Sequence, residues 1–430
     1  MNKQLRRLLY LSFILIFSVL APIFIAYSLG YRYRFDTNMV EKNGAFYIKS
    51  YPGGADIYLD GQPSRHRTPD QITEIRPGSY LVTIIKEAFV PWQKKLKVLP
   101  GETTFIQDVV LFFSDIKKNS LGSGSTNYLV NRTKNQYAYV DNKSYQLFIT
   151  DIEQDKNYQI YDFINNYQLL DWSPDNQKIL LGLAGKYYIF DINQKNLQTL
   201  SLPIADKVSW DSKNSRILWL STKQGLYTYD LEAAPAESLS EIKLNKKIYD
   251  FAVQDEYLII EYSLGDKYFL EQLDKNDLQP LQTSENITPG KIHLLLADRQ
   301  RFILTVGSIL YIKTLEKEAL TIPVTLADIH DDRLLISNGN EIILYNFKED
   351  WQDLIDRSTQ IVSDLLWHPN GSYFITEINS RTNLTEVDSR DKRNTINIID
   401  NPLKKSYIFN KKGDKLFVLT PEENFYLTIQ

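Results

Sequence analysis

The chain contains no cysteine among its 430 residues. Disulfide bonds, thiolate catalysis and zinc sites built on cysteine are therefore excluded. Histidine is also scarce, and the four histidines are His66, His293, His330 and His368. Because none of them stands in an H-E-x-x-H or H-x-H arrangement, the sequence argues against a histidine-rich metal site.

An excess of positive charge is missing as well. The formal net charge is -4, and the sequence pI is about 5.8. Nucleic-acid-binding domains usually carry a basic face. We therefore expect no nucleic-acid partner.

The sequence lacks the motifs of common enzyme classes. A nucleophile elbow needs G-x-S-x-G, whereas Gly122-Ser123-Gly124-Ser125 has these residue types at the wrong spacing. Neither a Walker A loop nor a dinucleotide-binding glycine loop occurs. We therefore predict no catalytic, cofactor-binding or metal-binding residues and no cofactor.

One long segment near the N-terminus has no charge. Leu8–Tyr31 carries no charged side chain, and about 20 apolar residues are enough for a helix to span a bilayer. The preceding basic tail, residues 1–7, favours an N-terminus in the cytoplasm. We predict a transmembrane anchor over residues 8–31, with the bulk of the chain outside the cytoplasmic membrane. One alternative is a buried core helix, which the length of the segment and its basic flank disfavour. The other is a cleaved signal peptide, whose apolar core is usually shorter.

Aromatic residues, in contrast, are abundant. The 28 Tyr and 20 Phe residues favour β-structure. A length of 430 residues predicts two or more domains. We expect a mainly β fold after the N-terminal helix.

Residues 44–113 have the pattern of a small all-β domain. In Ala55–Leu59, apolar and polar residues alternate as in a half-buried strand. Asp60-Gly61 follows as a hairpin turn. Pro77-Gly78 forms another turn before a second alternating strand.

This order of turns resembles that of the PEGA domain, a small β-sandwich. The resemblance rests on Pro52, Gly54, Ala55, Asp60, Gly61, Thr68, Pro69, Pro77, Gly78 and Trp92. Position 53 holds Gly where the namesake motif has Glu. The resemblance implies a surface-exposed accessory module without agreed catalytic residues, so these residues are expected to be structural.

The remaining chain divides into a short polar segment and a repeat region. Residues 114–126 are polar and contain Gly and Ser, and we predict a linker there. In residues 127–430, apolar strands and turns recur with a period of about 40 residues, which is typical of a β-propeller.

Two turns of the repeat region carry a tryptophan motif. They read Trp172-Ser173-Pro174-Asp175 and Trp367-His368-Pro369-Asn370-Gly371. Both resemble the W-S-P-D-G turn of WD40-like propellers, of the kind seen in the TolB family. We expect the Trp side chains to pack between blades and the turns to reverse the chain between the first two strands of a blade.

The number of turns predicts seven or eight blades. Three strands from the C-terminus would be completed by one strand from the start of the repeat region, which closes the ring. Trp351–Ser358 is either a strand or a helical insertion.

Two acidic segments are candidates for metal binding. They are Asp274–Asp277 and His330-Asp331-Asp332. Calcium requires six to eight converging oxygens, and the first segment lacks the Gly and distal Glu of an EF-hand loop. We interpret both segments as solvated turns, and His330 and His368 as turn-forming residues.

The sequence as a whole favours a noncatalytic, membrane-anchored binding or scaffold protein of the cell envelope. The expected partner is a protein or a surface polysaccharide. One alternative is an envelope hydrolase or lyase with carboxylates in the central channel of the propeller. Another is a self-assembling component of a surface structure.

Overall fold

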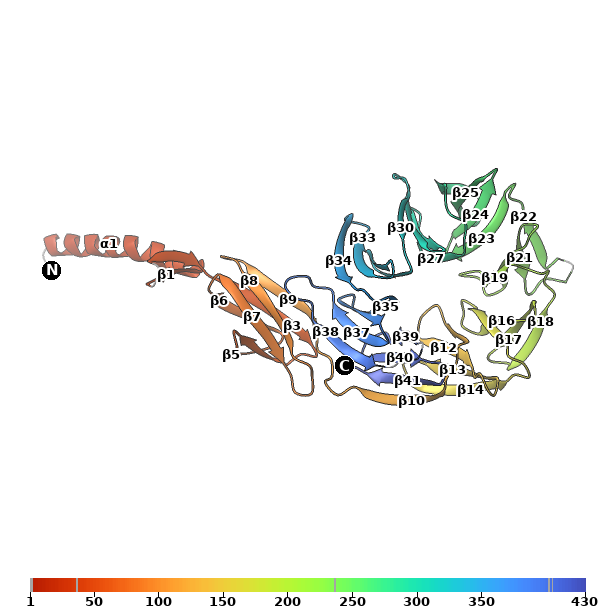
Figure 1. Ribbon diagram of the computed structural model, residues 1–430. Helices are drawn as coiled ribbons and strands as arrows, with labels where there is room; N and C mark the ends of the chain where they lie inside the picture. Colours follow the sequence, from red (N-terminus) through yellow and green to blue (C-terminus); the bar gives the residue numbers. More distant parts are fainter. Residues whose placement is uncertain (1–2, 36–37, 236, 401–402, 404) are drawn as a thin grey trace. The chain divides into compact units, whose positions relative to one another are not determined.

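The computed structural model describes residues 3–35, 38–235, 237–400, 403 and 405–430 (Figure 1). The fold is mainly β, as predicted. The chain divides into two compact units. Unit 1 contains Met1–Ile116, Glu386–Thr395 and Ile429–Gln430, and unit 2 contains Lys117–Thr385 and Ile396–Thr428.

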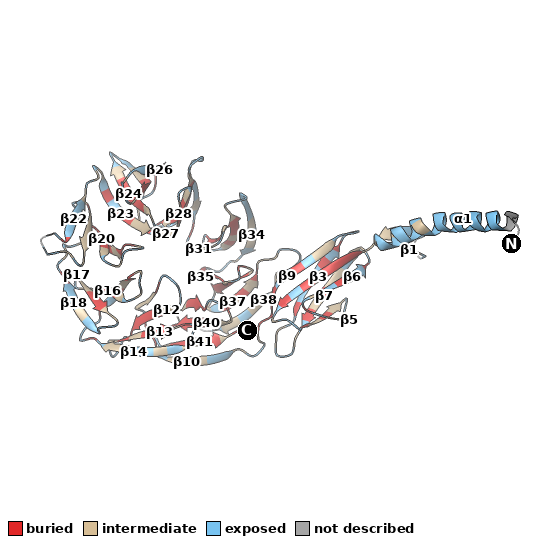
Figure 2. Cartoon of the chain, turned by 180° about the vertical axis from the view of Figure 1, so that it is seen from behind, coloured by how far each residue is buried: buried red, intermediate tan, exposed pale blue. Residues whose placement is uncertain are grey.

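Unit 1 begins with the apolar helix α1 (Lys3–Ser28), which contains Pro22. Its stretch Arg6–Ser28 is long and apolar enough to cross a membrane, a property that signal sequences share. Its side chains are almost all exposed (Figure 2). The helix ends at Ser28, so the last residue of the predicted anchor, Tyr31, lies in the first strand instead.

A two-stranded hairpin and two further sheets complete the main part of unit 1. The hairpin pairs β1 (Tyr31–Arg34) with β2 (Met39–Lys42). One sheet contains β3 (Gly44–Tyr51), β6 (Asp70–Ile75) and β9 (Thr103–Val110), and the other contains β4 (Asp56–Leu59), β5 (Gln62–Arg67), β7 (Gly78–Ile85) and β8 (Trp92–Val98). Apolar side chains from both sheets, including Phe46, Ile57 and Trp92, form one core between them. The arrangement is the small β-sandwich that was predicted.

The segment Glu386–Thr395 of unit 1 packs on strand β8. The ammonium of Lys94 is 2.9 Å from a carboxylate oxygen of Glu386 and 3.4 Å from one of Asp388. The indole N–H of Trp92 donates to Glu386 over 3.0 Å. Because the side chain of Lys94 is fully buried, its charge depends on these carboxylates for compensation.

Unit 2 is a β-propeller. In its described residues, eight four-stranded sheets form a ring of blades (Figure 1), so the blade number is eight. Blade 1 contains β11 (Tyr128–Val130), β12 (Gln136–Val140), β13 (Gln146–Asp151) and β14 (Lys156–Asp162), and blade 2 contains β15 (Gln168–Trp172), β16 (Lys178–Leu183), β17 (Lys186–Asp191) and β18 (Asn196–Leu200). Blade 3 contains β19 (Lys207–Trp210), β20 (Ile217–Ser221), β21 (Leu226–Asp230) and β22 (Leu239–Ile242), and blade 4 contains β23 (Lys247–Gln254), β24 (Tyr257–Leu264), β25 (Lys267–Asp274) and β26 (Pro280–Glu285).

The other four blades complete the ring. Blade 5 contains β27 (Ile292–Ala297), β28 (Arg301–Val306), β29 (Ile309–Thr314) and β30 (Leu320–Pro323), and blade 6 contains β31 (Leu326–His330), β32 (Arg333–Ser337), β33 (Glu341–Asn346) and β34 (Trp351–Arg357). Blade 7 contains β35 (Val362–Trp367), β36 (Tyr373–Ile378), β37 (Arg381–Glu386) and β38 (Thr395–Asp400), and blade 8 contains β39 (Ser406–Phe409), β40 (Lys415–Leu419), β41 (Glu423–Thr428) and β10 (Lys117–Ser123). The first strand of each blade is the innermost one.

The ring closes in blade 8, where the outermost strand comes from the segment that precedes residues 127–430. Strand β10 pairs antiparallel with β41. The prediction of a linker over residues 114–126 is therefore wrong, because this segment contains β10. An outermost strand buries little of its surface, and most residues of β10 are exposed, so its polar composition resembles that of a linker. The ambiguous segment at Trp351 is likewise an outermost strand, β34.

Gly124 lies at this closure and has no room for a side chain. A Cβ there would be 2.4 Å from the backbone nitrogen of Glu423 and 2.4 Å from the carbonyl oxygen of Thr420. We expect Gly124→Ala to lower the free energy of unfolding by about 1–3 kcal/mol, as overpacking usually does. Denaturant titration measures this change. Gly225→Ala is the control, since its Cβ would meet nothing closer than 4.0 Å, and an equal cost for both variants would contradict the closure described.

Candidate functional site

The residues that carry the PEGA resemblance form turns or pack in the core of unit 1. Thr68 is buried, and its backbone N–H and carbonyl pair with the carbonyl of Ala55 and the N–H of Gly54. Its hydroxyl accepts from the N–H of Ala55 over 3.1 Å. The turn at residues 52–55 is thereby fixed to the Thr68-Pro69 segment.

The other motif positions of unit 1 lie in the second sheet. Asp60 and Gly61 have φ angles of 50° and 77°, as the tight turn between β4 and β5 requires. The carboxylate of Asp60 also accepts the N–H of Leu81 over 2.8 Å. Pro77-Gly78 leads into β7, and Trp92 is buried in the core.

The first propeller turn motif lies between the first two strands of blade 2. Trp172 is buried, and its indole N–H donates to the carbonyl of Leu129 in blade 1 over 3.1 Å. Ser173 accepts the N–H of Lys178 over 2.8 Å and donates to Asp175 over 2.6 Å. Pro174 lies inside this turn between β15 and β16. These contacts join blades 1 and 2 and fix the chain reversal.

The second copy, at Trp367, joins blades 6, 7 and 8. His330 Nε2 is 2.9 Å from the carbonyl oxygen of Pro369, and His368 Nε2 is 2.9 Å from that of Gly413. Gly371 has a φ of 68° in the turn. Each histidine therefore contacts the turn of the next blade, a structural role that agrees with their interpretation as turn residues.

The two tryptophans differ in one hydrogen bond, which allows a matched test. The indole N–H of Trp367 is buried and has no partner among the described residues, whereas that of Trp172 is bonded. We expect Trp172→Phe to lower the free energy of unfolding by about 1 kcal/mol more than Trp367→Phe, because only the first substitution removes a hydrogen bond of the indole N–H. Denaturant titration of both variants gives the difference, and equal costs would show that the bond does not contribute.

The inner strands carry a repeated aspartate that our sequence analysis missed. In three blades this carboxylate accepts a backbone N–H from the inner strand of a neighbouring blade. The bonds run from Trp210 to Asp171, from Ile292 to Asp250 and from Trp367 to Asp328, over 2.8, 2.7 and 2.8 Å. The signal in the sequence is an Asp directly before an aromatic or aliphatic residue in the first strand of a blade, as in Asp171-Trp172. These carboxylates stabilise contacts between blades.

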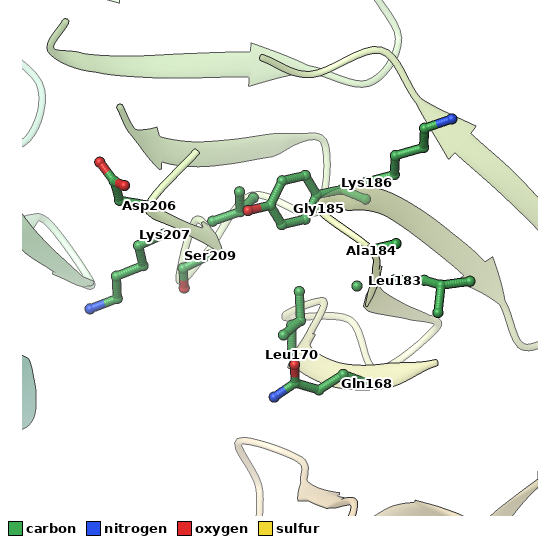
Figure 3. A pocket seen from close by; sticks show the side chains of 12 residues that line it. Gln168, Leu170, Leu183, Ala184, Gly185, Lys186, Asp206, Lys207 and Ser209 are labelled. Atoms are coloured by element: carbon green, nitrogen blue, oxygen red, sulfur yellow. The ribbon is translucent and has the colours of Figure 1, made fainter. Parts of the chain in front are cut away.

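Two cavities adjoin on the inner strands of blades 2 to 5. The first has a volume of about 430 Å³ and lies between blades 2 and 3. Figure 3 shows Asp206, Lys207 and Ser209 on one side of it and Leu183–Lys186 on the other. The second has a volume of about 570 Å³, and Asp206 and Lys207 line it too. We take these two cavities as the candidate functional site.

The second cavity contains a buried carboxyl group that is incompletely paired. Glu261 is fully buried, and its Oε1 accepts the N–H of Gly290 over 3.3 Å. Its Oε2 has no partner among the described residues. Burial, together with the nearby charge of Asp250, raises the pKa of Glu261 to about 7. This carboxyl group is therefore partly protonated at neutral pH.

Two neighbouring charges of this cavity, those of Lys207 and Asp250, are paired with each other. The ammonium of Lys207 is 3.0 Å from Asp250 Oδ1 and donates to the carbonyl of Phe251 over 2.6 Å. Asp250 also accepts the N–H groups of Phe251 and Ile292. Asp206, Asp250 and Glu261 thus line one cavity, and among the described residues only Asp250 of these three forms an ion pair.

A second buried polar cluster lies between blades 7 and 8. Glu377 accepts from Lys405 over 3.1 Å and from the hydroxyl of Tyr407 over 2.6 Å. Burial raises the pKa of Asp364 to about 6, and the charges of Glu377 and Asp328 add to this effect. The cluster is internally paired and supports the junction of the two blades.

The acidic segments considered as metal ligands lie in turns. Asp274 ends β25 and accepts the N–H of Asn276 over 2.9 Å. Asp331 and Asp332 lie in the turn between β31 and β32. Within the described part of the chain, no group of three or more His, Asp or Glu side chains is placed to hold a metal ion.

Comparison with known proteins identifies both domains. The family model of the PEGA domain matches residues 43–109. A solved structure of a eukaryotic initiation factor is 12% identical with a TM-score of 0.52, and the match covers 72% of this chain and 98% of that chain. The Dos1 propeller (13% identity, TM-score 0.49, 73% and 94% covered) and the WD40 domain of SCAP from fission yeast (11%, 0.47, 74% and 98%) are also similar. No curated protein matches the chain. These likenesses concern the fold alone, and the chain combines a PEGA domain at residues 43–109 with a β-propeller.

Proposed function

We propose that this protein is a membrane-anchored, extracytoplasmic binding protein of the cell envelope whose propeller binds a protein partner. The observation that carries the proposal is the apolar helix α1, whose side chains are exposed. In the chain, this helix is followed by the PEGA domain and the propeller. An exposed apolar helix of this length is stable in a bilayer but not in water. The basic residues before it favour an N-terminus in the cytoplasm.

The propeller supports a binding role because a rigid ring presents loops and cavities for recognition. The charged cavities on the inner strands of blades 2 to 5 offer a place for contact. Proteins and polysaccharides are both available at a cell surface. We favour a protein because charged groups such as Asp206 and Lys207 line the cavities.

Binding to isolated cell envelope tests this proposal. The full chain in lipid nanodiscs is incubated with envelope from the source organism, before and after protease treatment of the envelope. We expect saturable binding that protease abolishes. Binding that survives protease would identify a polysaccharide instead, and absence of binding to either preparation would contradict the proposal.

One observation favours a second candidate, an envelope hydrolase or lyase. Glu261 has a pKa of about 7 and lines a cavity together with Asp206 and Asp250, and such a carboxyl group suits general acid–base chemistry at neutral pH. Turnover of envelope polysaccharides by the wild-type chain, lost in Glu261→Gln, would establish it. No turnover by the wild-type chain would exclude it.

A further inference from the structure

The unpaired carboxyl group of Glu261 indicates what the 570 Å³ cavity binds. Glu261 lies in β24 opposite Asp250 of β23, and both residues line the cavity. Its side chain is fully buried, and Oε2 has no hydrogen-bond partner among the described residues. A buried carboxylate oxygen without a donor is costly, so a ligand that donates to it would gain affinity.

The environment of the two lysines in the cavity decides the charge of that ligand. Lys207 is held by Asp250 and by the carbonyl of Phe251, so its ammonium is already compensated. Lys291 also lines the cavity but is exposed to solvent, where its charge is screened. The group in need of a partner is therefore an anion.

We propose that this cavity binds an ammonium or guanidinium group, supplied by a basic side chain of the partner protein, which pairs with Glu261. This inference rests on the proposed function, because it names the chemistry by which the propeller holds its partner.

The size of the cavity agrees with an organic cation. A volume of about 570 Å³ lies in the range of sites that hold small organic groups, about 300–1,000 Å³. A metal ion requires several converging oxygens, and no such group occurs among the described residues. The raised pKa of Glu261 agrees with the lack of a partner for its carboxylate, because burial without a nearby cation disfavours the charged form.

The test uses two cationic ligands and a neutral ligand that has nearly the same shape as one of them. The full chain in nanodiscs is titrated calorimetrically with N-acetyl-arginine amide, with N-acetyl-lysine amide, and with N-acetyl-citrulline amide, the neutral counterpart of the arginine compound. We expect saturable binding of at least one cationic ligand and at least tenfold weaker binding of the citrulline compound. Equal binding of the arginine and citrulline compounds, or no binding of either cation, would overturn the inference.

Two variants locate the bound cation. Glu261→Gln removes the unpaired charge, and we expect it to weaken binding of the cationic ligand at least tenfold. Glu285→Gln removes one charge from an exposed position of the same blade and is expected to bind like the wild type. Equal affinity of Glu261→Gln and wild type would overturn the inference. Because the ligand comparison uses wild-type protein, the test holds even if one variant folds poorly.

The same experiments separate this inference from the proposed function. Protease-sensitive binding to envelope without binding of either cation would overturn the cation site and leave the proposed function standing. Loss of envelope binding in Glu261→Gln, but not in Glu285→Gln, would support both together.

Discussion

Lys94→Met is expected to lower the free energy of unfolding of unit 1 by about 3–5 kcal/mol, the usual cost of removing one partner from a buried ion pair. The side chain of Lys94 is fully buried between the carboxylates of Glu386 and Asp388. Methionine keeps the length of the stem but removes the charge. Glu386 is then left buried, with only neutral donors such as Trp92. Denaturant titration followed by tryptophan fluorescence measures the change.

Two further variants make this test specific. Lys95→Met makes the same substitution at the next, exposed position of β8, and we expect a change within about 0.5 kcal/mol. Lys94→Met combined with Glu386→Gln removes both charges and should recover part of the loss. Similar costs for Lys94→Met and Lys95→Met would show that the buried pair does not stabilise unit 1.

The second large effect is a pH dependence of stability that originates at Glu261. Its pKa is about 7 in the folded chain, against an ordinary value of 4.5 for a glutamate side chain. Between these values the folded state binds more protons than the unfolded state, so the free energy of unfolding falls as the pH rises. The loss is complete above pH 7 and amounts to about 3 kcal/mol. Below pH 4.5 the group is protonated in both states and contributes no slope.

Glu261→Gln removes this titration. We therefore expect the variant to gain about 3 kcal/mol relative to wild type between pH 4 and pH 8. Equilibrium unfolding across this pH range gives the difference. Glu285→Gln, at an exposed position, should follow the wild type. Parallel curves for wild type and Glu261→Gln would show that Glu261 ionises as freely as an exposed carboxyl group.

Strong periodic signals in the sequence predicted most of the architecture. The apolar run at residues 8–31, the order of turns around Asp60-Gly61 and the two tryptophan turns identified the helix, the PEGA domain and the propeller. These signals arise from local physics, since turns need particular backbone conformations and buried strands need apolar residues.

The outermost strands of the blades were the elements that the sequence predicted least well. The sequence predicts a linker where β10 lies and does not distinguish strand from helix where β34 lies. Both strands are mostly exposed and carry little of the apolar pattern on which strand prediction depends. Their identity follows from pairing with a neighbouring strand. For β10 that neighbour, β41, lies at the other end of the chain.

The candidate site was not predictable for a related reason. Glu261 has no motif around it in the sequence, and pairing of β23 with β24 brings it opposite Asp250, one of the repeated aspartates. Lys207 comes from the preceding blade. Only the repeated Asp before an aromatic or aliphatic residue, as at Asp171, was visible in the sequence.

The most direct test of the central claim, a propeller anchored outside the cytoplasmic membrane, is labelling with a membrane-impermeant maleimide. Because the chain has no cysteine, Thr199→Cys places a single thiol at an exposed position of blade 2. Gln4→Cys, before the apolar run, serves as the cytoplasmic control. The account predicts that Thr199→Cys is labelled in intact cells and that Gln4→Cys is labelled only after permeabilisation. The reverse pattern, or release of the labelled chain from the membrane without the helix, would contradict it.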